Sequence, residues 1–224
     1  FENLFVAPPV APQKIKRFKM ASLLYITVSG FDKLYDRADS QGLMDHLDAL
    51  LLLVDDVASR YNLLKIKTVG DNFLFAGGIL TENRTNPIDV VLAALEIRSL
   101  WAEESALSNN FWTIAMGIHT GPVFGEPTGR KHTPFFLTGD SVSIVTRLGM
   151  SSPANMVRLS VMTYELVKEF FQVSRCGLFP VKYNGMMDVF VLDGILPSFL
   201  DASRSGINHQ FYIKYSIIQF MDLQ

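Results

Sequence analysis

The chain has 224 residues, which suits one large domain, and 49% of them are apolar, which supplies a core and excludes a disordered chain. Its net charge of −2 excludes general binding to nucleic acid, which requires a basic surface. The single cysteine, Cys176, excludes an internal disulfide and favours a reducing compartment, so we expect a cytoplasmic protein.

Apolar runs in the sequence are far shorter than the ~20 residues that a membrane span needs. The chain begins at Phe1 rather than at Met, so we expect it to be a fragment of a longer protein. Any attachment to a membrane would then run through parts of that protein outside this chain, which would form its cytosolic portion.

The first elements can be predicted in chain order. Residues 1–19 are rich in proline and then in lysine and arginine, so we expect a linker. Residues 20–28 are apolar enough for a buried strand, and Gly30 in the turn that follows lets backbone N–H groups approach a ligand. Residues 41–61 carry an apolar stripe at helical spacing, and Ser40 is placed to cap that helix.

Residues 63–78 predict a hairpin. Leu64, Ile66 and Thr68 alternate with lysines, as in a half-buried strand, and a turn at Gly70 and Asp71 leads into a second apolar strand. A carboxylate at the tip of a rigid hairpin is a suitable ligand for a hard cation, and Lys67 on the adjacent strand is suited to meet a phosphate or a base edge.

The rest of the chain alternates between strands and helices. We expect helices at 88–106, from Asp140 (which can cap its helix), and at 161–170. We also expect a turn at 121–122 and a loop at 126–134. The expected strands are residues 111–119, 123–125, 135–137, 155–159, 171–174, 178–182 and 187–192.

The C-terminal stretch, residues 195–224, is ambiguous, since its apolar residues suit an extra strand or a short docking helix. We expect an extension that covers a sheet edge, following a domain at 20–194. The element order predicts an α+β fold with a ferredoxin-like core, in which helices pack on a mixed, mostly antiparallel sheet.

Five stretches, in order along residues 21–193, resemble the class III adenylyl and guanylyl cyclase catalytic domain. They are L-L-Y-I-T-V-S-G-F, K-I-K-T-V-G-D, M-G-I-H-T-G-P-V, F-F-L-T-G-D-S-V-S-I-V-T-R and V-K-Y-N-G-M-M-D-V-F. The resemblance implies that ATP or GTP is converted to a 3′,5′-cyclic nucleotide and pyrophosphate. It also implies two Mg²⁺ or Mn²⁺ ions on two aspartates and a site that lies across a dimer interface.

The residues that hold the metal ions and the phosphates only partly match that pattern. Asp71 matches one metal-binding aspartate, but Thr27 stands at the position of the other, and a neutral hydroxyl is a poor ligand for Mg²⁺. Gly30 and Phe31 match the phosphate turn. Asn184 replaces a lysine that contacts phosphate in the late hairpin.

The residues for the base and the transition state are also mixed. Lys67 matches the lysine that reads adenine, but its usual partner is replaced by Phe136, which can stack on a base and cannot accept a hydrogen bond from it. Arg147 matches the arginine that stabilises the transition state, whereas Ser143 replaces the asparagine four residues earlier.

Three functional hypotheses follow. In the first, this chain is the degenerate half of a heterodimeric adenylyl cyclase, to which it contributes Lys67 and Arg147 while its partner holds both metal ions. In the second, it is an active homodimeric adenylyl cyclase with an unorthodox site. In the third, it is a pseudoenzyme that senses nucleotides or dimerises without catalysis.

Overall fold

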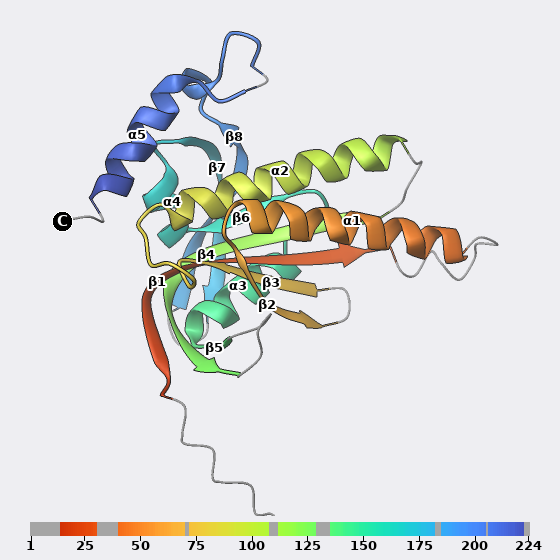
Figure 1. The fold of residues 1–224 in the computed structure, drawn as a ribbon, viewed down its shortest axis with the longest axis horizontal. Coiled ribbons are helices and arrows are strands. Elements are labelled where there is room, and N and C mark those ends of the chain that lie inside the picture. Colours follow the sequence, from red (N-terminus) through yellow and green to blue (C-terminus); the bar gives the residue numbers. More distant parts are fainter. Residues whose placement is uncertain are drawn as a thin grey trace, which may run out of the picture.

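A mixed eight-stranded sheet forms the centre of the structure, a computed structural model that describes residues 14–30, 40–69, 72–107, 112–128, 135–181, 185–204 and 206–221. The strand order is β2-β3-β1-β4-β6-β8-β7, and β5 pairs with β4 off this path (Figure 1). Only the β4–β6 pair is parallel among the described strands. The strands are β1 (Lys16–Ser29), β2 (Leu64–Val69), β3 (Asn72–Gly77), β4 (Thr113–Pro127), β5 (Phe135–Thr138), β6 (Val157–Ser160), β7 (Phe171–Val181) and β8 (Gly185–Ile195).

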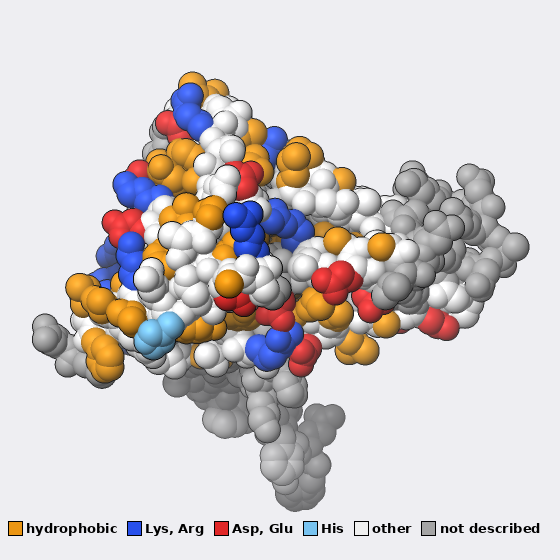
Figure 2. Space-filling model, turned by 90° about the horizontal axis from the view of Figure 1, so that it is seen from above, with side chains coloured by type: hydrophobic (Ala, Val, Ile, Leu, Met, Phe, Trp, Pro, Cys, Tyr) orange, Lys and Arg blue, Asp and Glu red, His pale blue; other side chains and the backbone are white. Residues whose placement is uncertain are grey.

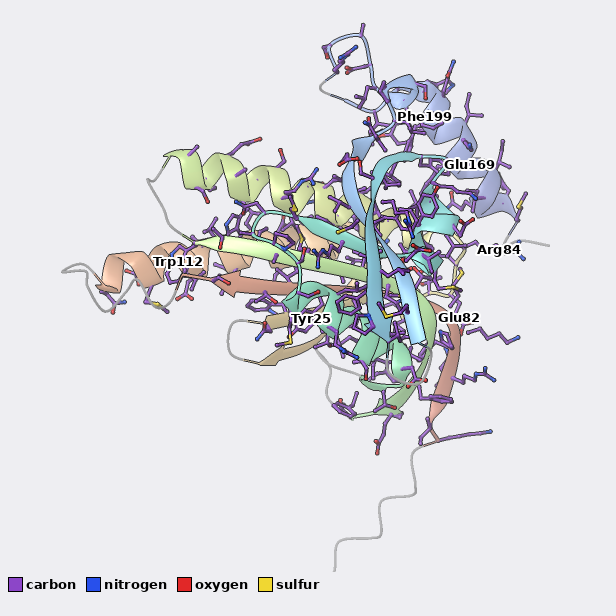
Figure 3. The ribbon with its side chains drawn as sticks, turned by 180° about the vertical axis from the view of Figure 1, so that it is seen from behind. Tyr25, Glu82, Arg84, Trp112, Glu169 and Phe199 are labelled. Carbon is purple, nitrogen blue, oxygen red and sulfur yellow. The ribbon has the colours of Figure 1, made fainter. Side chains whose placement is uncertain are left out.

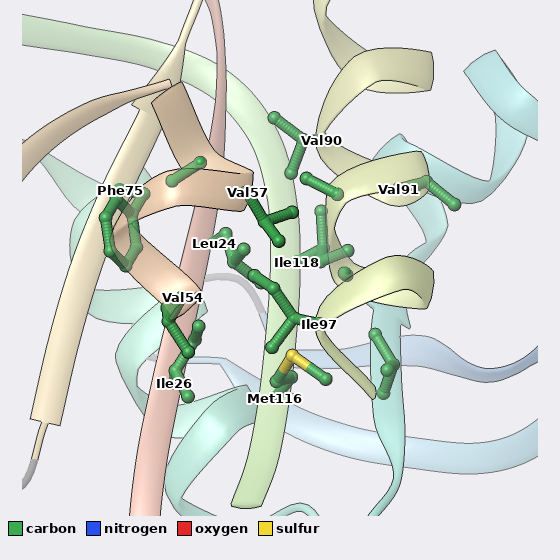
Figure 4. Close-up of a cluster of buried hydrophobic side chains, with 14 of the residues drawn as sticks. Leu24, Ile26, Val54, Val57, Phe75, Val90, Val91, Ile97, Met116 and Ile118 are labelled. Carbon is green, nitrogen blue, oxygen red and sulfur yellow. The ribbon is translucent and has the colours of Figure 1, made fainter. Parts of the chain in front are cut away.

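Helices cover both faces of this sheet. They are α1 (Ser40–Arg60), α2 (Asn86–Leu107), α3 (Asp140–Met150), α4 (Val161–Val167) and α5 (His209–Phe220). Helices α1 and α2 lie side by side on one face, where Leu24 and Ile26 of β1 meet Val54 and Val57 of α1 (Figures 1 and 4). Helix α3 packs on the other face through Val145. The predicted α+β class with a mixed, mostly antiparallel sheet and a ferredoxin-like core is therefore confirmed.

The predicted turn at Gly121 and Pro122 is wrong, because β4 runs through both residues without a break. In the pairing with β1, Phe18 lies opposite Val123 and Ala21 lies opposite Gly121, so two residues of β1 bulge opposite Pro122. A bulge interrupts the hydrogen-bond ladder and therefore tolerates a proline, which has no N–H to donate. The same pairing starts β1 at Lys16, earlier than the predicted residue 20.

Other boundaries also differ from the prediction, and β7 and the start of α3 are two examples. Strand β7 is one strand rather than two, because the Arg175-Cys-Gly177 segment forms a register shift and Gly177 has a φ of 131° that favours glycine. Asp140 is the first residue of α3 and does not cap it, since Gly139 occupies the cap position without a side-chain hydrogen bond.

The C-terminal stretch forms a docked helix rather than a strand. Asn208 caps α5, and its side-chain oxygen accepts a hydrogen bond from the Phe211 N–H at 3.3 Å. The Phe211 ring is buried against Phe170 and Phe199, and the Tyr215 hydroxyl donates to Asp89 of α2 at 2.7 Å. Burial raises the pKa of the Asp89 carboxyl. Ring packing on Phe170 and Phe199 and one partly buried hydrogen bond to α2 therefore hold α5 in place.

The surface carries charges of both signs. Figure 2 shows the upper side of Figure 1, where α2 and α5 lie, with lysine and arginine interspersed with acidic and apolar side chains. This face therefore has no continuous basic stripe of the kind that binds nucleic acid. Among the helices in the described part of the chain, none has both the length and the hydropathy needed to cross a bilayer.

Two glycines bring α3 into direct contact with the sheet. A Cβ on Gly117 of β4 would lie 2.9 Å from the Gly149 Cα, and a Cβ on Gly149 would lie 2.5 Å from the ring of Tyr25 on β1. Since real Cβ atoms do not approach other atoms this closely, only glycine allows the helix to lie at this depth. The main chain of α3 is thereby held on β1 and β4.

A buried polar network lies where β1, β4, β6 and α4 meet. His119 is 4% exposed, and its Nδ1 lies 2.8 Å from the Ser160 hydroxyl. Hydroxyl contacts of 2.9–3.3 Å continue through Thr163 and Thr120 to Ser22. Burial lowers the pKa of His119 from 6.5 to about 4, so the folded protein holds a neutral imidazole.

We expect this histidine to make stability depend on pH. Between pH 6.5 and 4 the unfolded imidazole takes up a proton that the folded one does not, so the free energy of unfolding falls as the pH drops through this window, by up to about 3 kcal/mol. Urea unfolding of the wild type and of His119→Gln at several pH values checks this. The variant is expected to show a smaller pH slope, and equal slopes would contradict the assignment.

Candidate active site

The exposed side of α3 carries two of the predicted catalytic residues. Ser143 and Arg147 are four residues apart, so they lie on the same side of the helix, one turn from each other. Both line a cleft of about 470 Å³ between α3 and β7. Figure 3 shows this side of the molecule, with β7 and β8 running past α3. The cleft is lined by Asp140, Val142, Ser143, Ile144, Thr146, Arg147, Phe179, Pro180 and Val181.

Arg147 contacts an aromatic ring in this cleft. Its guanidinium carbon lies 5.7 Å from the centroid of the Phe179 ring on β7, within the range of a cation–π interaction. The Arg147 guanidinium forms no ion pair or hydrogen bond with any residue that the structure describes. Its N–H donors are therefore available to an anion, as a contact with phosphate requires.

The predicted metal positions lie on different elements from this cleft. Thr27 of β1 lies opposite Asn72 of β3, the residue that follows Asp71 in the chain, and Asp71 itself falls outside the described residues. The Thr27 hydroxyl is buried and has no hydrogen-bond partner among the residues that the structure describes. In the described part of the chain no three acidic, histidine or cysteine side chains cluster as metal ligands do.

The described residues at this position do not fit a two-metal site. Mg²⁺ and Mn²⁺ prefer carboxylate oxygens, and Thr27 supplies a neutral hydroxyl in a place where no described neighbour accepts or donates a hydrogen bond to it. Gly30 follows β1 with a φ of 126°, a conformation that favours glycine and agrees with the predicted turn. Phe31 lies outside the described residues, as does Asn184.

The two positions predicted to contact the base lie on neighbouring strands. Lys67 is on β2, opposite Leu74 of β3, and Phe136 is on β5, opposite Glu126 of β4. Strands β2 and β5 lie close to each other. The Phe136 side chain is 48% exposed, which leaves its ring accessible for stacking.

Among the described residues, the α3–β7 cleft contains two of the predicted site residues, Ser143 and Arg147. The described lining of the α3–β7 cleft comes from α3 and β7, whereas Thr27 and Lys67 are on β1 and β2.

Phe179 is one of several cleft residues that were not predicted from the sequence. It precedes the V-K-Y-N-G stretch by two residues, so the resemblance covered its neighbours but gave it no role. Asp140, Thr146 and Pro180 also line the cleft without having been predicted to do so. The alternation of Phe179 and Val181 along β7 is the signal that points to a shared side of that strand.

Comparison with known sequences identifies relatives. Residues 13–194 match the adenylate and guanylate cyclase catalytic domain family. The guanylate cyclase soluble subunit alpha-1 of Rattus norvegicus is 25% identical over 154 residues, which cover 69% of this chain and 22% of that protein. The adenylate cyclase of Mycobacterium tuberculosis is 24% identical over 178 residues, which cover 80% of this chain and 40% of that protein. The chain thus spans less than half the length of these relatives.

Solved structures share the fold. The guanylate cyclase domain from Catenaria anguillulae in complex with GTP has a TM-score of 0.71 at 24% identity and covers 81% of this chain and 100% of that one. An adenylyl cyclase from P. aeruginosa has a TM-score of 0.72 at 20% identity. The aligned part covers 80% of this chain and 95% of the P. aeruginosa chain. Since similar proteins of both kinds occur, the comparisons leave the base specificity undetermined.

Proposed function

We propose that this chain, which belongs to the adenylate and guanylate cyclase catalytic domain family, supplies one half of a nucleotidyl cyclase site formed between two such domains. In the reaction the 3′-hydroxyl of a nucleoside triphosphate attacks the α-phosphorus. The hydroxyl proton leaves, the bond to the pyrophosphate oxygen breaks, and a 3′,5′-cyclic nucleotide and pyrophosphate form. The observation that carries the proposal is the placement of Ser143 and Arg147 on one wall of the α3–β7 cleft.

Arg147 has the central role in this half-site. Its permanently charged guanidinium donates hydrogen bonds to phosphate oxygens and stabilises the negative charge that develops as pyrophosphate leaves. Ser143, one turn earlier, offers a hydroxyl donor on the same side of the helix. That hydroxyl reaches less far than an amide, so it gives weaker orientation of the ribose.

The metal ions of this reaction would be held by the partner domain. When bound, Mg²⁺ or Mn²⁺ supplies Lewis-acid stabilisation of the phosphates. Thr27 lacks the carboxylate that such an ion needs, so a homodimer of this chain would repeat the same deficiency in both of its sites. A heterodimer with an intact cyclase domain avoids that deficiency, because the partner contributes both aspartates.

The substrate we propose is ATP. Lys67 on β2 would be the donor to the base, at a position where guanylyl cyclases usually carry an acid, and the exposed Phe136 would add a stacking surface in place of an acceptor. The reaction would take place in the cytosol.

Because Thr27, Phe136, Ser143 and Asn184 all depart from the family's pattern, a module that binds nucleotide without catalysis is the second candidate. An active homodimer is the third.

Assays of cyclic nucleotide formation distinguish these functions. The chain is assayed with ATP and with GTP in Mn²⁺, alone and mixed with a cyclase domain that has both metal aspartates and an inactivating substitution at its own transition-state arginine. Activity only in the mixture, with ATP preferred, is the expected result. Activity of the chain alone would favour the homodimer. Silence in a mixture whose heterodimer is demonstrated by mass would favour the non-catalytic module.

A further inference from the structure

We propose that Phe179 is a positioning residue for Arg147: its ring holds the guanidinium on the wall of the α3–β7 cleft before nucleotide arrives. The inference rests on the proposed function of Arg147 for its catalytic consequence. The contact itself is a property of the isolated chain, where the guanidinium carbon lies 5.7 Å from the ring centroid.

The position of Phe179 is set by the β7–β8 ribbon. Phe179 pairs with Met187 of β8, in a part of the ribbon beyond the β6–β8 pairing that ends at Val189. Along β7, Phe179 and Val181 are partly buried, while Leu178 and Pro180, which alternate with them, are exposed. The partly buried side of this strand therefore faces α3, and Phe179 projects from it toward Arg147.

A ring suits this purpose better than a carboxylate would. Arginine carries several rotatable bonds, and ordering them when the guanidinium engages the charge of the transition state costs conformational entropy. An ion pair would order the side chain too, but it would use the N–H donors and oppose the approach of phosphate. Contact with the face of a ring restrains the guanidinium and leaves its donors to the ligand.

The contact of Arg147 with the ring is expected to be weaker than its contact with phosphate. An exposed cation–π contact is weak, whereas a charge-assisted contact of arginine with phosphate is strong and often bidentate. The phosphates of a bound nucleotide therefore outcompete the ring for the guanidinium when the Arg147 side chain has to move. The ring restrains Arg147 in the empty cleft without trapping it there.

Loss of the ring is expected to lower kcat of the mixed pair by about two- to fivefold, with a smaller change in KM. This factor is what the weak energy of an exposed cation–π contact gives when about 1.4 kcal/mol corresponds to a tenfold change in rate. Phe179→Leu keeps an apolar side chain of similar size and removes the π face. Phe179→Trp keeps and strengthens that face, so it is expected to retain the rate. Leu178→Ala, on the exposed side of the same strand, is the matched control and is expected to leave kcat unchanged.

A spectroscopic measurement on the isolated chain tests the contact without any need for activity. The Arg147 side-chain N–H signal, assigned by its loss in Arg147→Lys, is expected to lie upfield because of the ring and to move downfield in Phe179→Leu. An unchanged signal would overturn the inference even if the mixture is active. A shifted signal with kcat unchanged in Phe179→Leu would overturn the positioning role. If the wild-type mixture is silent, the proposed function fails, while the signal still decides whether the ring holds Arg147.

Discussion

Replacing Arg147 with alanine is expected to lower cyclic nucleotide formation by the mixed pair of domains by a factor of about 10²–10³. The Arg147 guanidinium is a cation in a cleft where it has no polar partner among the described residues, so its loss removes charge stabilisation that no other described lining residue supplies. The effect should appear in kcat more than in KM, because the charge on the phosphates grows as pyrophosphate leaves. Steady-state assays at saturating ATP and Mn²⁺ measure it.

Two variants sharpen this experiment. Arg147→Lys keeps the charge but loses the planar set of donors, so an intermediate rate is expected. Arg60→Ala removes the same charge at the end of α1, where Arg60 pairs with Glu96 at 2.6 Å outside the cleft, and is expected to leave the rate unchanged. A rate for Arg147→Ala within twofold of the wild type would rule out a transition-state role for this arginine.

The isolated chain is expected to be about a thousandfold or more slower than the mixture, because Thr27 withholds one metal carboxylate from every site of a homodimer. Thr27→Asp restores that carboxylate beside the β2–β3 turn and is expected to raise the activity of the isolated chain at least about tenfold. Activity should remain below that of the mixture, since Ser143 and Asn184 are unchanged. Rates with Mn²⁺ and with Mg²⁺ provide the comparison.

Metal binding by this variant can also be followed without turnover. A buried aspartate without a cation is unfavourable, so Thr27→Asp should lower the melting temperature in chelator and recover it on addition of Mn²⁺. Thr27→Asn, which is nearly isosteric and neutral, should show no such recovery. If Mn²⁺ stabilises the wild type and Thr27→Asp equally, the absent carboxylate is not what limits metal binding.

The sheet and its main helices were predictable because their patterns are local. The apolar stripe of α1 and the alternation in β2 can be recognised within a few residues. The path of β4 through Pro122 could not be predicted in this way, since the bulge that accommodates the proline lies about a hundred residues earlier, between Phe18 and Ala21. The same limit applied to α5, whose anchoring hydroxyl on Tyr215 meets a carboxylate in α2.

The candidate site also has one part that local sequence patterns predict and another part that depends on tertiary structure. Ser143 and Arg147 share a helix, so their common side follows from their spacing of four residues. Phe179 reaches Arg147 only because the β7–β8 ribbon passes α3, which depends on tertiary structure. The role of Asp71 stays a prediction, because that residue lies outside the described part of the chain.

Helix α3 separates the residues that keep the protein folded from those that would perform chemistry. Its buried side consists of Ser141, Val145, Leu148 and Gly149, and Gly149 meets the main chain of β4 directly. Ser143 and Arg147 point to the cleft and contribute nothing to that contact. Substitution of Ser143 or Arg147 therefore has little thermodynamic consequence for the domain. Such a scaffold can exchange a catalytic asparagine for serine and still fold, which is what the proposed pairing of this chain with an intact cyclase domain requires.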